Sequence, residues 1–334
     1  MSKTLQRWAE MLRCPVDACP LRVAGVPRST DEAGYGCASC GRLFPVAQGI
    51  LRCLDAAPLA DGAQADEMRA RDADADQFES NFTDRQSALE IPPFLRAMRP
   101  MADDAVLDLG CGTGRVTLRY ARWVRRIVAV DFSLHSLLVL RRKIAPELTD
   151  RFLLIQADIA ALPLAPHSFT QAISFAVFEH LPTAELRRRA AAAAARQLVP
   201  GGTFTCAVYH WSKRKRREAA RGIGDDTRKE GFHDSNIYYY NFEGPEFREL
   251  LEAAGLRVEL LRGLVIGFRG GRFLGPCRSR PTDSSPGPAG GFGTAITFWP
   301  GPGPVSPVGG PDPPGFGRGL AATINPGFPG PWRE

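Results

Sequence analysis

The sequence predicts an α/β protein whose central part, from about residue 81 to residue 274, forms a doubly wound, mostly parallel sheet. Two observations lead to this fold class: short apolar runs alternate with helix-forming stretches, and a glycine-rich turn follows the first of these runs. Neighbouring strands of a parallel sheet are connected by helices, and helices on both faces bury the strands completely. Continuous apolar runs separated by helical segments are the pattern that such a sheet requires.

Strands and helices can be placed in order along this central part. We expect strands at residues 105–109, 126–130, 151–156, 170–175, 202–209 and 256–261. We expect helices between them at residues 115–123, 134–143, 183–197 and 245–254. The last helix is followed by Gly255, a residue type that commonly ends helices.

The composition is that of a globular protein and excludes several classes. The chain has 334 residues, 44% of them hydrophobic, with 42 lysines and arginines against 36 aspartates and glutamates. The net charge of +6 is too small to indicate nucleic-acid binding by itself. No apolar run reaches about 18 residues, so we expect no transmembrane helix and no membrane partner. No signal-peptide pattern follows Met1, and eight cysteines are few for a disulfide scaffold of this length, so we expect a cytoplasmic protein.

Residues 1–54 form a cysteine-rich module. Cys14 and Cys19 make a C-x4-C pair, and Cys37 and Cys40 make a C-x2-C pair after a gap of 17 residues. Four thiolates on two turns suit a tetrahedral zinc ion, and a closed shell of four protein ligands gives that ion a structural role. The first pair is wider than the usual C-x2-C, so free thiols are the alternative.

Two segments of unusual composition flank the predicted sheet. Residues 55–80 are rich in alanine and aspartate, and we expect an acidic linker that becomes a helix near residues 67–79. Residues 275–334 contain 14 glycines and 14 prolines, and such a segment buries too little apolar surface to offset the entropy lost on ordering. We expect a disordered tail, with a proline-rich partner ligand or a shifted reading frame as the alternatives.

The strongest chemical signal is the turn after the first strand of the sheet. Residues 108–114 read Asp-Leu-Gly-Cys-Gly-Thr-Gly, and glycine allows the backbone to pass close to a ligand. The dinucleotide fingerprint would need its third glycine at Arg115, which argues against NAD. The next strand ends at Asp131, where a carboxylate can accept hydrogen bonds from both hydroxyls of a ribose.

Over about residues 100–262 the sequence resembles class I S-adenosylmethionine-dependent methyltransferases. The glycine turn, Asp131, the motif Ala157-Asp158-Ile159 and the turn Leu198-Val-Pro-Gly-Gly202 stand in that family's order. The resemblance implies a Rossmann-like sheet of seven strands and transfer of a methyl group from S-adenosyl-L-methionine to an O, N or C nucleophile. It also implies a set of cofactor-binding residues, namely Asp108, Gly110, Cys111, Gly112, Gly114, Asp131, Phe132, Asp158, Ile159 and Phe175. A Rossmann-like fold without a cofactor is the alternative.

Methyl transfer asks little of catalytic side chains, because the sulfonium already makes the methyl group electrophilic and the protein mainly aligns the reactants. Where the acceptor is a hydroxyl a base helps, and His180, just past the fourth strand, is the candidate. A histidine that only packs on the substrate loop is the alternative, and Glu179 is open to the same two interpretations. Cys111 and Cys206 are expected to be buried packing residues.

Further parts of the chain resemble pieces of related enzymes. Residues 41–50 resemble the small zinc-binding activator of RNA and release-factor methyltransferases, and the place of this module is similar to that in ribosomal RNA guanine-N1 methyltransferases, whose ribbon touches RNA. A helix at the place of the acidic linker often covers the cofactor in the resembling enzymes, so Gln77, Phe78 and Phe82 either touch the ligand or simply pack. The fold's antiparallel seventh strand has its candidate at residues 294–298, inside the predicted tail.

The acceptor is the least determined part of the prediction. The zinc ribbon and the five consecutive cations at residues 213–217 favour RNA. The aromatic residues at 238–240 and at 242 could stack on bases or line an apolar pocket, to which residues 232–234 could contribute. We expect a small-molecule acceptor, with an RNA base as the first alternative and a non-catalytic, cofactor-binding scaffold as the second.

Overall fold

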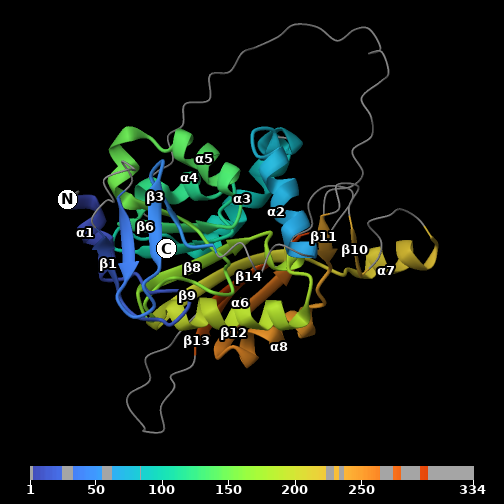
Figure 1. Ribbon diagram of the computed structural model, residues 1–334. Helices are drawn as coiled ribbons and strands as arrows, with labels where there is room; N and C mark the ends of the chain where they lie inside the picture. Colours follow the sequence, from blue (N-terminus) through green and yellow to red (C-terminus); the bar gives the residue numbers. More distant parts are fainter. Residues whose placement is uncertain are drawn as a thin grey trace, which may run out of the picture. The chain divides into compact units, whose positions relative to one another are not determined.

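The computed structural model describes residues 3–24, 33–54, 62–82, 84–222, 229–232, 237–263, 274–279 and 294–299 (Figure 1). For residues 262–263, 274–279 and 294–299 the description covers the backbone. The sequence-based predictions for His233, Asp234 and the proline-rich stretch from residue 300 onward lie outside the described residues.

A parallel sheet with the strand order β7-β6-β5-β8-β9 forms the centre of the protein, which confirms the predicted fold class. These strands are β5 (Ala105–Leu109), β6 (Arg126–Asp131), β7 (Phe152–Gln156), β8 (Phe169–Phe175) and β9 (Leu198–Tyr209). The chain adds β6 and β7 on one side of β5 and then returns to add β8 on the other side. In an open parallel sheet this reversal forms a crevice at the carboxyl ends of the two diverging strands.

Helices cover both faces of the sheet, so every residue of β5 is buried. On one face lie α3 (Asp84–Met98), α4 (Thr117–Tyr120) and α5 (Leu134–Lys143), and on the other lie α6 (Ala184–Gln197) and α8 (Gly244–Ala253). The Ser133 hydroxyl accepts the Ser136 N–H at 3.0 Å and so begins α5, and Thr183 caps α6 in the same way. Three short 3-10 helices complete this part at Ala121–Trp123, Pro146–Arg151 and Phe178–His180.

The cysteine-rich module continues the central sheet. It consists of α1 (Lys3–Ala9), β1 (Leu21–Ala24), β2 (Gly34–Cys37), β3 (Leu43–Ala47) and β4 (Ile50–Arg52). Strand β4 pairs in parallel with β7, with Ile50 opposite Leu154, and the fully buried Leu12 forms a bridge with Leu164. The sheet therefore runs from β1 through β4 into β7 without a break, which the sequence pattern did not predict.

The acidic linker folds into α2 (Ala63–Asp74) and a 3-10 turn at Phe78–Asn81. Helix α2 begins four residues before the predicted helix and packs against α5. At its end the Asp72 carboxylate accepts hydrogen bonds from the Ser133 hydroxyl at 2.6 Å and from the His135 N–H at 3.1 Å. These bonds hold α2 over the carboxyl end of β6.

The far edge of the sheet differs from the prediction in strand number and in strand direction. Between β9 and β12 (Leu256–Gly263) lie β13 (Leu274–Ser279), which is antiparallel to both, and β14 (Thr294–Trp299), which is parallel to both. The candidate seventh strand does pair, but in parallel, and the prediction of a disordered tail is wrong for these two segments. The β-branched and aromatic residues Thr-Ala-Ile-Thr-Phe-Trp of β14 suit a strand, and the gap between β9 and β12 offers two open edges for hydrogen bonds.

A helix and a hairpin lie beyond β9. These are α7 (Lys213–Ala220) and the antiparallel pair of β10 (Glu230–Phe232) and β11 (Tyr238–Tyr240). No helix among the described residues has the length and apolar character that crossing a membrane requires.

Candidate active site

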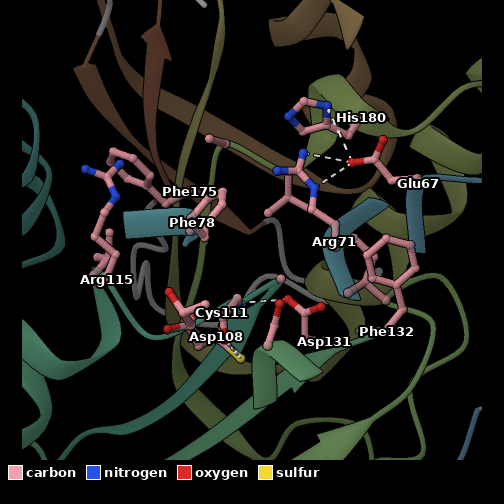
Figure 2. Close-up of a pocket in the computed structure, with 18 of the residues that line it drawn as sticks. Glu67, Arg71, Phe78, Asp108, Cys111, Arg115, Asp131, Phe132, Phe175 and His180 are labelled. Carbon is pink, nitrogen blue, oxygen red and sulfur yellow. Dashed lines mark hydrogen bonds and ion pairs between the residues drawn. The ribbon is translucent and has the colours of Figure 1, made fainter. Parts of the chain in front are cut away.

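A pocket lies at the carboxyl ends of β5, β6 and β8, in the crevice that the reversal of strand order creates (Figure 2). Helix α2 and the turn after it form its cover. The pocket includes all of the predicted cofactor-binding residues except Gly114, together with the predicted base His180. The lining consists of Gln64, Glu67, Arg71, Phe78, Phe82, Asp108, Gly110, Cys111, Gly112, Thr113, Arg115, Val116, Thr117, Asp131, Phe132, Ser136, Ala157, Asp158, Ile159, Phe175, Ala176, Val177, His180 and Leu181.

The glycine turn shapes the floor of the pocket. Gly110 has a φ of 73°, and a Cβ atom there would lie 2.4 Å from Cγ2 of Val177, so this position requires glycine on both grounds. Gly112 has a φ of 52°, and nothing within 4 Å would meet a Cβ atom on it. Its backbone N–H donates to Oδ2 of Asp131 at 2.7 Å, which ties the turn to the end of β6.

Asp131 is buried at the end of β6, and both of its carboxylate oxygens accept backbone hydrogen bonds. Oδ2 is bonded to the glycine turn and Oδ1 accepts the Ser133 N–H at 2.9 Å. Burial raises the pKa of Asp131, and these two N–H donors oppose the rise. Each carboxylate oxygen has further lone-pair capacity, so the group can still accept ligand hydroxyls.

Asp108 lines the pocket, and its carboxylate also forms hydrogen bonds with the helix that follows the glycine turn. Its Oδ2 accepts hydrogen bonds from the Thr117 hydroxyl at 2.7 Å and from the Tyr120 hydroxyl at 2.9 Å. Burial raises the pKa of Asp108 to about 6, because removal from water disfavours the charged carboxylate more than the two hydroxyls favour it. These bonds connect β5 to the helix that follows the glycine turn.

The residues predicted to hold adenine lie together along the β6 and β7 side of the pocket. Phe132 and Ile159 contribute apolar surface, and Oδ1 of Asp158 accepts the Ala160 N–H at 2.8 Å. That bond fixes the Asp158 side chain at the rim. Gln156 donates to the Phe132 carbonyl at 3.1 Å and so links the ends of the two strands.

The cover contributes polar residues that the sequence analysis missed. Nε of Arg71 donates a hydrogen bond of 2.8 Å to Oε1 of Glu67, and Nη2 of Arg71 forms an ion pair of 2.8 Å with the same oxygen. The Glu67 side chain is only 5% exposed. Nδ1 of His180 lies 3.8 Å from the same oxygen, and Figure 2 shows these three side chains gathered on one side of the pocket. The signal was present as Glu67 and Arg71 spaced four residues apart, but that spacing is typical of exposed helix faces.

Nδ1 of His180 lies 2.7 Å from the Tyr238 carbonyl oxygen. A carbonyl only accepts, so Nδ1 carries the proton, and in the neutral ring the lone pair is on Nε2. His180 also contacts the Tyr209 ring edge-on, with ring centroids 5.6 Å apart. The neighbouring Glu179 is fully buried outside the pocket lining, as is Cys206 on β9.

Aromatic side chains form the remaining wall. Phe78 and Phe82 line the pocket with Phe175, whereas the predicted Gln77 is exposed and does not line it. The Arg115 guanidinium stacks 3.9 Å from the centroid of the Phe82 ring and forms an ion pair of 3.1 Å with the buried Glu90. This stacking holds the turn after α2 against the glycine turn.

The predicted RNA-binding elements do not lie in the pocket. Helix α7 exposes Lys213, Arg216 and Arg217. The aromatic residues at 238–240 and at 242 are buried, so their rings cannot stack on bases.

A second cluster lies in the cysteine-rich module, away from the pocket lining. Cys14, Asp17, Cys37 and Cys40 bring four potential metal-ligand atoms within 4.8 Å of one another. Cys19, the predicted fourth ligand, is not part of this group, and Asp17 takes its place. Cys19 packs against the hydrophobic core.

Residues 106–202 match the profile of a methyltransferase domain family. The matched residues contain the glycine turn, Asp131, Asp158 and His180. An uncharacterized methyltransferase of Geobacillus kaustophilus (strain HTA426) is 29% identical over 142 residues, which are 42% of this chain and 62% of that protein. A demethylmenaquinone methyltransferase of Clavibacter sepedonicus is 39% identical over 74 residues, 22% of this chain and 29% of that protein. The chain thus spans less than two thirds of these curated relatives.

A solved methyltransferase structure has a fold similar to that of this chain. The 1,6-didemethyltoxoflavin-N1-methyltransferase of Burkholderia thailandensis, solved with 1,6-didemethyltoxoflavin and S-adenosylhomocysteine bound, superimposes with a TM-score of 0.52 at 16% identity. The match covers 78% of this chain and 100% of that one. Together with the family profile, this likeness supports a Rossmann-like methyltransferase fold.

Proposed function

We propose that the protein transfers the methyl group of S-adenosyl-L-methionine to a small molecule that binds beneath α2. One observation carries the proposal: the motif residues of the methyltransferase domain and the side chains of α2 line the same pocket. The first set provides a cofactor site, and the second provides a wall for an acceptor next to it.

The motif residues fit the cofactor by their chemistry. Asp131 presents a carboxylate for two ribose hydroxyls, and Phe132 and Ile159 present apolar surface for adenine. The open face of Gly112 leaves room for the methionine part of the cofactor. When bound, the cofactor supplies an electrophilic methyl group on a positively charged sulfur. The remaining task of the chain is to hold the acceptor in line with that methyl group and to exclude water.

Three features of the cover suit a small, partly aromatic acceptor. Phe78, Phe82 and Phe175 offer ring faces and edges for stacking. The Glu67–Arg71 pair offers both an acceptor and donors for hydrogen bonds from an almost buried position. The name of the Clavibacter relative, a demethylmenaquinone methyltransferase, agrees with an acceptor that is not a nucleic acid.

His180 is the group that accepts a proton from the acceptor. The Tyr238 carbonyl holds the proton on Nδ1, so Nε2 is the basic nitrogen of the neutral ring. The bound cofactor would supply the methyl group and keep the electron pair of the broken sulfur–methyl bond, and Nε2 of His180 would take the proton that the acceptor oxygen or nitrogen loses. The Glu67 carboxylate, 3.8 Å from Nδ1, stabilises the charged ring that results.

The experiment follows the methyl label. Purified protein is incubated with methyl-labelled S-adenosyl-L-methionine and a fractionated cell extract, and label is measured in organic-soluble and RNase-sensitive material. We expect label in the organic fraction, lost in Asp131→Ala and retained in Asp103→Ala, whose side chain is exposed and outside the pocket. No label in any fraction, with intact binding of S-adenosylhomocysteine, would instead support the non-catalytic scaffold.

An RNA base is the second candidate acceptor, and the exposed cations of α7 favour it. Label in RNase-sensitive material, lost when Lys213, Arg216 and Arg217 are replaced by alanine, would establish this alternative and overturn the small-molecule acceptor. Label that survives these replacements would leave α7 without a role in acceptor binding.

The cysteine-rich module has a separate role in this proposal. Its thiolates lie outside the pocket lining, so a zinc ion held there stabilises the fold and takes no part in methyl transfer.

A further inference from the structure

The two turns that carry the clustered ligands share one backbone geometry. In the first turn the Ala18 N–H donates to the Cys14 carbonyl at 2.9 Å, and in the second the Gly41 N–H donates to the Cys37 carbonyl at 3.0 Å. The Cys14 N–H donates to the carbonyl five residues later at 2.8 Å, and the Cys37 N–H does the same at 2.9 Å. The turns are therefore copies of one another, related position by position.

The equivalent hydrogen bonds align the residues of the first turn with those of the second. Cys14 matches Cys37, and Asp17, three residues after Cys14, matches Cys40, three residues after Cys37. The residue that follows has a positive φ in both turns, 59° at Ala18 and 71° at Gly41. Alanine at such a φ costs about 1–2 kcal/mol, so the first turn keeps this shape at the expense of backbone strain.

Two kinds of separation within the cluster, sulfur to sulfur and sulfur to oxygen, fit a tetrahedral ion, and all four ligand atoms lie within 4.8 Å of one another. With metal–sulfur bonds of about 2.3 Å and metal–oxygen bonds of about 2.0 Å, neighbouring ligands lie about 3.8 Å apart for two sulfurs and about 3.5 Å apart for sulfur and oxygen. Sγ of Cys14 and Sγ of Cys40 are 3.6 Å apart, and Sγ of Cys37 lies 3.4 Å from each Asp17 oxygen. Three thiolates with one carboxylate oxygen suit zinc.

Cys19 takes part in the first turn through its backbone. Its N–H donates to Oδ1 of Asp17 at 3.1 Å, and its carbonyl accepts the Cys14 N–H. Its side chain packs against the hydrophobic core of the module.

We infer that the module binds zinc through Cys14, Asp17, Cys37 and Cys40, a three-thiolate and one-carboxylate site in which Cys19 is not a ligand. This assignment rests on the structural zinc of the proposed function and specifies its fourth ligand. The first turn then reads C-x2-D and repeats the spacing of the C-x2-C turn.

Metal content of the full-length chain tests the assignment. The protein is purified from zinc-supplemented medium, and bound zinc is measured by mass spectrometry for the wild type, Cys19→Ser, Asp17→Asn and Asp17→Cys. We expect stoichiometric zinc in the wild type and in Cys19→Ser, and at least a tenfold weaker zinc affinity in Asp17→Asn by competition with a chelating dye. Circular dichroism of each variant checks that it is folded.

Cobalt substitution counts the thiolates and distinguishes the possible failures. Sulfur-to-cobalt charge-transfer absorption grows with the number of thiolate ligands, so it should be unchanged in Cys19→Ser and should rise by about a third in Asp17→Cys. Zinc lost in Cys19→Ser and kept in Asp17→Asn would overturn the ligand assignment while leaving the structural zinc in place. A folded wild type without zinc or cobalt binding would overturn both.

Discussion

Glu179 is fully buried next to the pocket, and its burial predicts that the protein loses stability as the pH rises. Burial raises the pKa of Glu179 from 4.5 to about 8, against smaller opposing effects of the backbone N–H groups of Glu179 and Tyr209 and of the Arg71 charge. The folded state therefore holds a proton on this group where the unfolded chain has released it. Stability is highest below the unfolded pKa and falls until the pH exceeds the folded pKa.

The size of the effect follows from the two pKa values. Between the ordinary pKa of 4.5 and about 8 the folded state binds one more proton, and each pH unit lowers the free energy of unfolding by about 1.4 kcal/mol. From about pH 5 to about pH 8 the wild type should therefore lose about 4 kcal/mol from this group alone. Glu179→Gln has the shape of the protonated acid and no titration, so it should escape this loss.

Urea unfolding followed by tryptophan fluorescence measures the difference at both pH values. The stability difference between Glu179→Gln and the wild type should move in favour of the variant by about 4 kcal/mol from pH 5 to pH 8, and all other titrating groups cancel in this comparison. Glu185→Gln, on the exposed surface of α6, is the matched control and should show no such change. A difference that stays constant with pH would refute a buried, protonated Glu179.

Three further perturbations test the packing around the pocket and the module. Gly110→Ala forces a Cβ atom to 2.4 Å from Val177 and should lower the melting temperature and abolish stabilisation by S-adenosylhomocysteine. Leu12→Ala should cost about 2–5 kcal/mol in urea unfolding, because Leu12 is fully buried where the module meets the methyltransferase domain. Glu90→Gln removes the carboxylate that forms the ion pair with the nearly buried Arg115 and should cost about 3–5 kcal/mol by the same assay.

Local sequence patterns predicted the centre of the fold and one half of the pocket. The strands β5 to β9 could be placed because each is a short apolar run, and the glycine turn and Asp131 could be assigned because their chemistry depends on residues close in sequence. The pairing of β14 with β9 could not be predicted, since six other helices and strands, α7 to β13, lie between them in the sequence. The pairing also depends on an edge that only the folded sheet presents.

The sequence analysis missed Glu67, Arg71 and Asp17, because the roles of these residues depend on the folded structure. Glu67 and Arg71 have the spacing of a surface ion pair, and only the position of α2 above the crevice turns them inward. Asp17 was missed because Cys19 completed the expected set of four thiolates. Asp17 nevertheless follows Cys14 by three residues, the same spacing as between Cys37 and Cys40. The inward position of Glu67 and Arg71 depends on where α2 lies in the folded protein. The place of Asp17 in the cluster depends on the backbone conformation of the turn.

Hydrogen bonds connect the cysteine-rich module to the pocket, so the proposed metal site is not structurally independent of the pocket. Residues 11–13 lie directly before Cys14, a proposed ligand, and they form hydrogen bonds with residues 163–165. The Arg13 N–H donates to the Pro163 carbonyl at 2.9 Å, and the Ala165 N–H donates to the Met11 carbonyl at 2.7 Å. That loop begins at Asp158 and Ile159, which line the pocket. A metal bound at the proposed site would therefore also hold this loop in place, and part of its binding free energy would stabilise the proposed cofactor site.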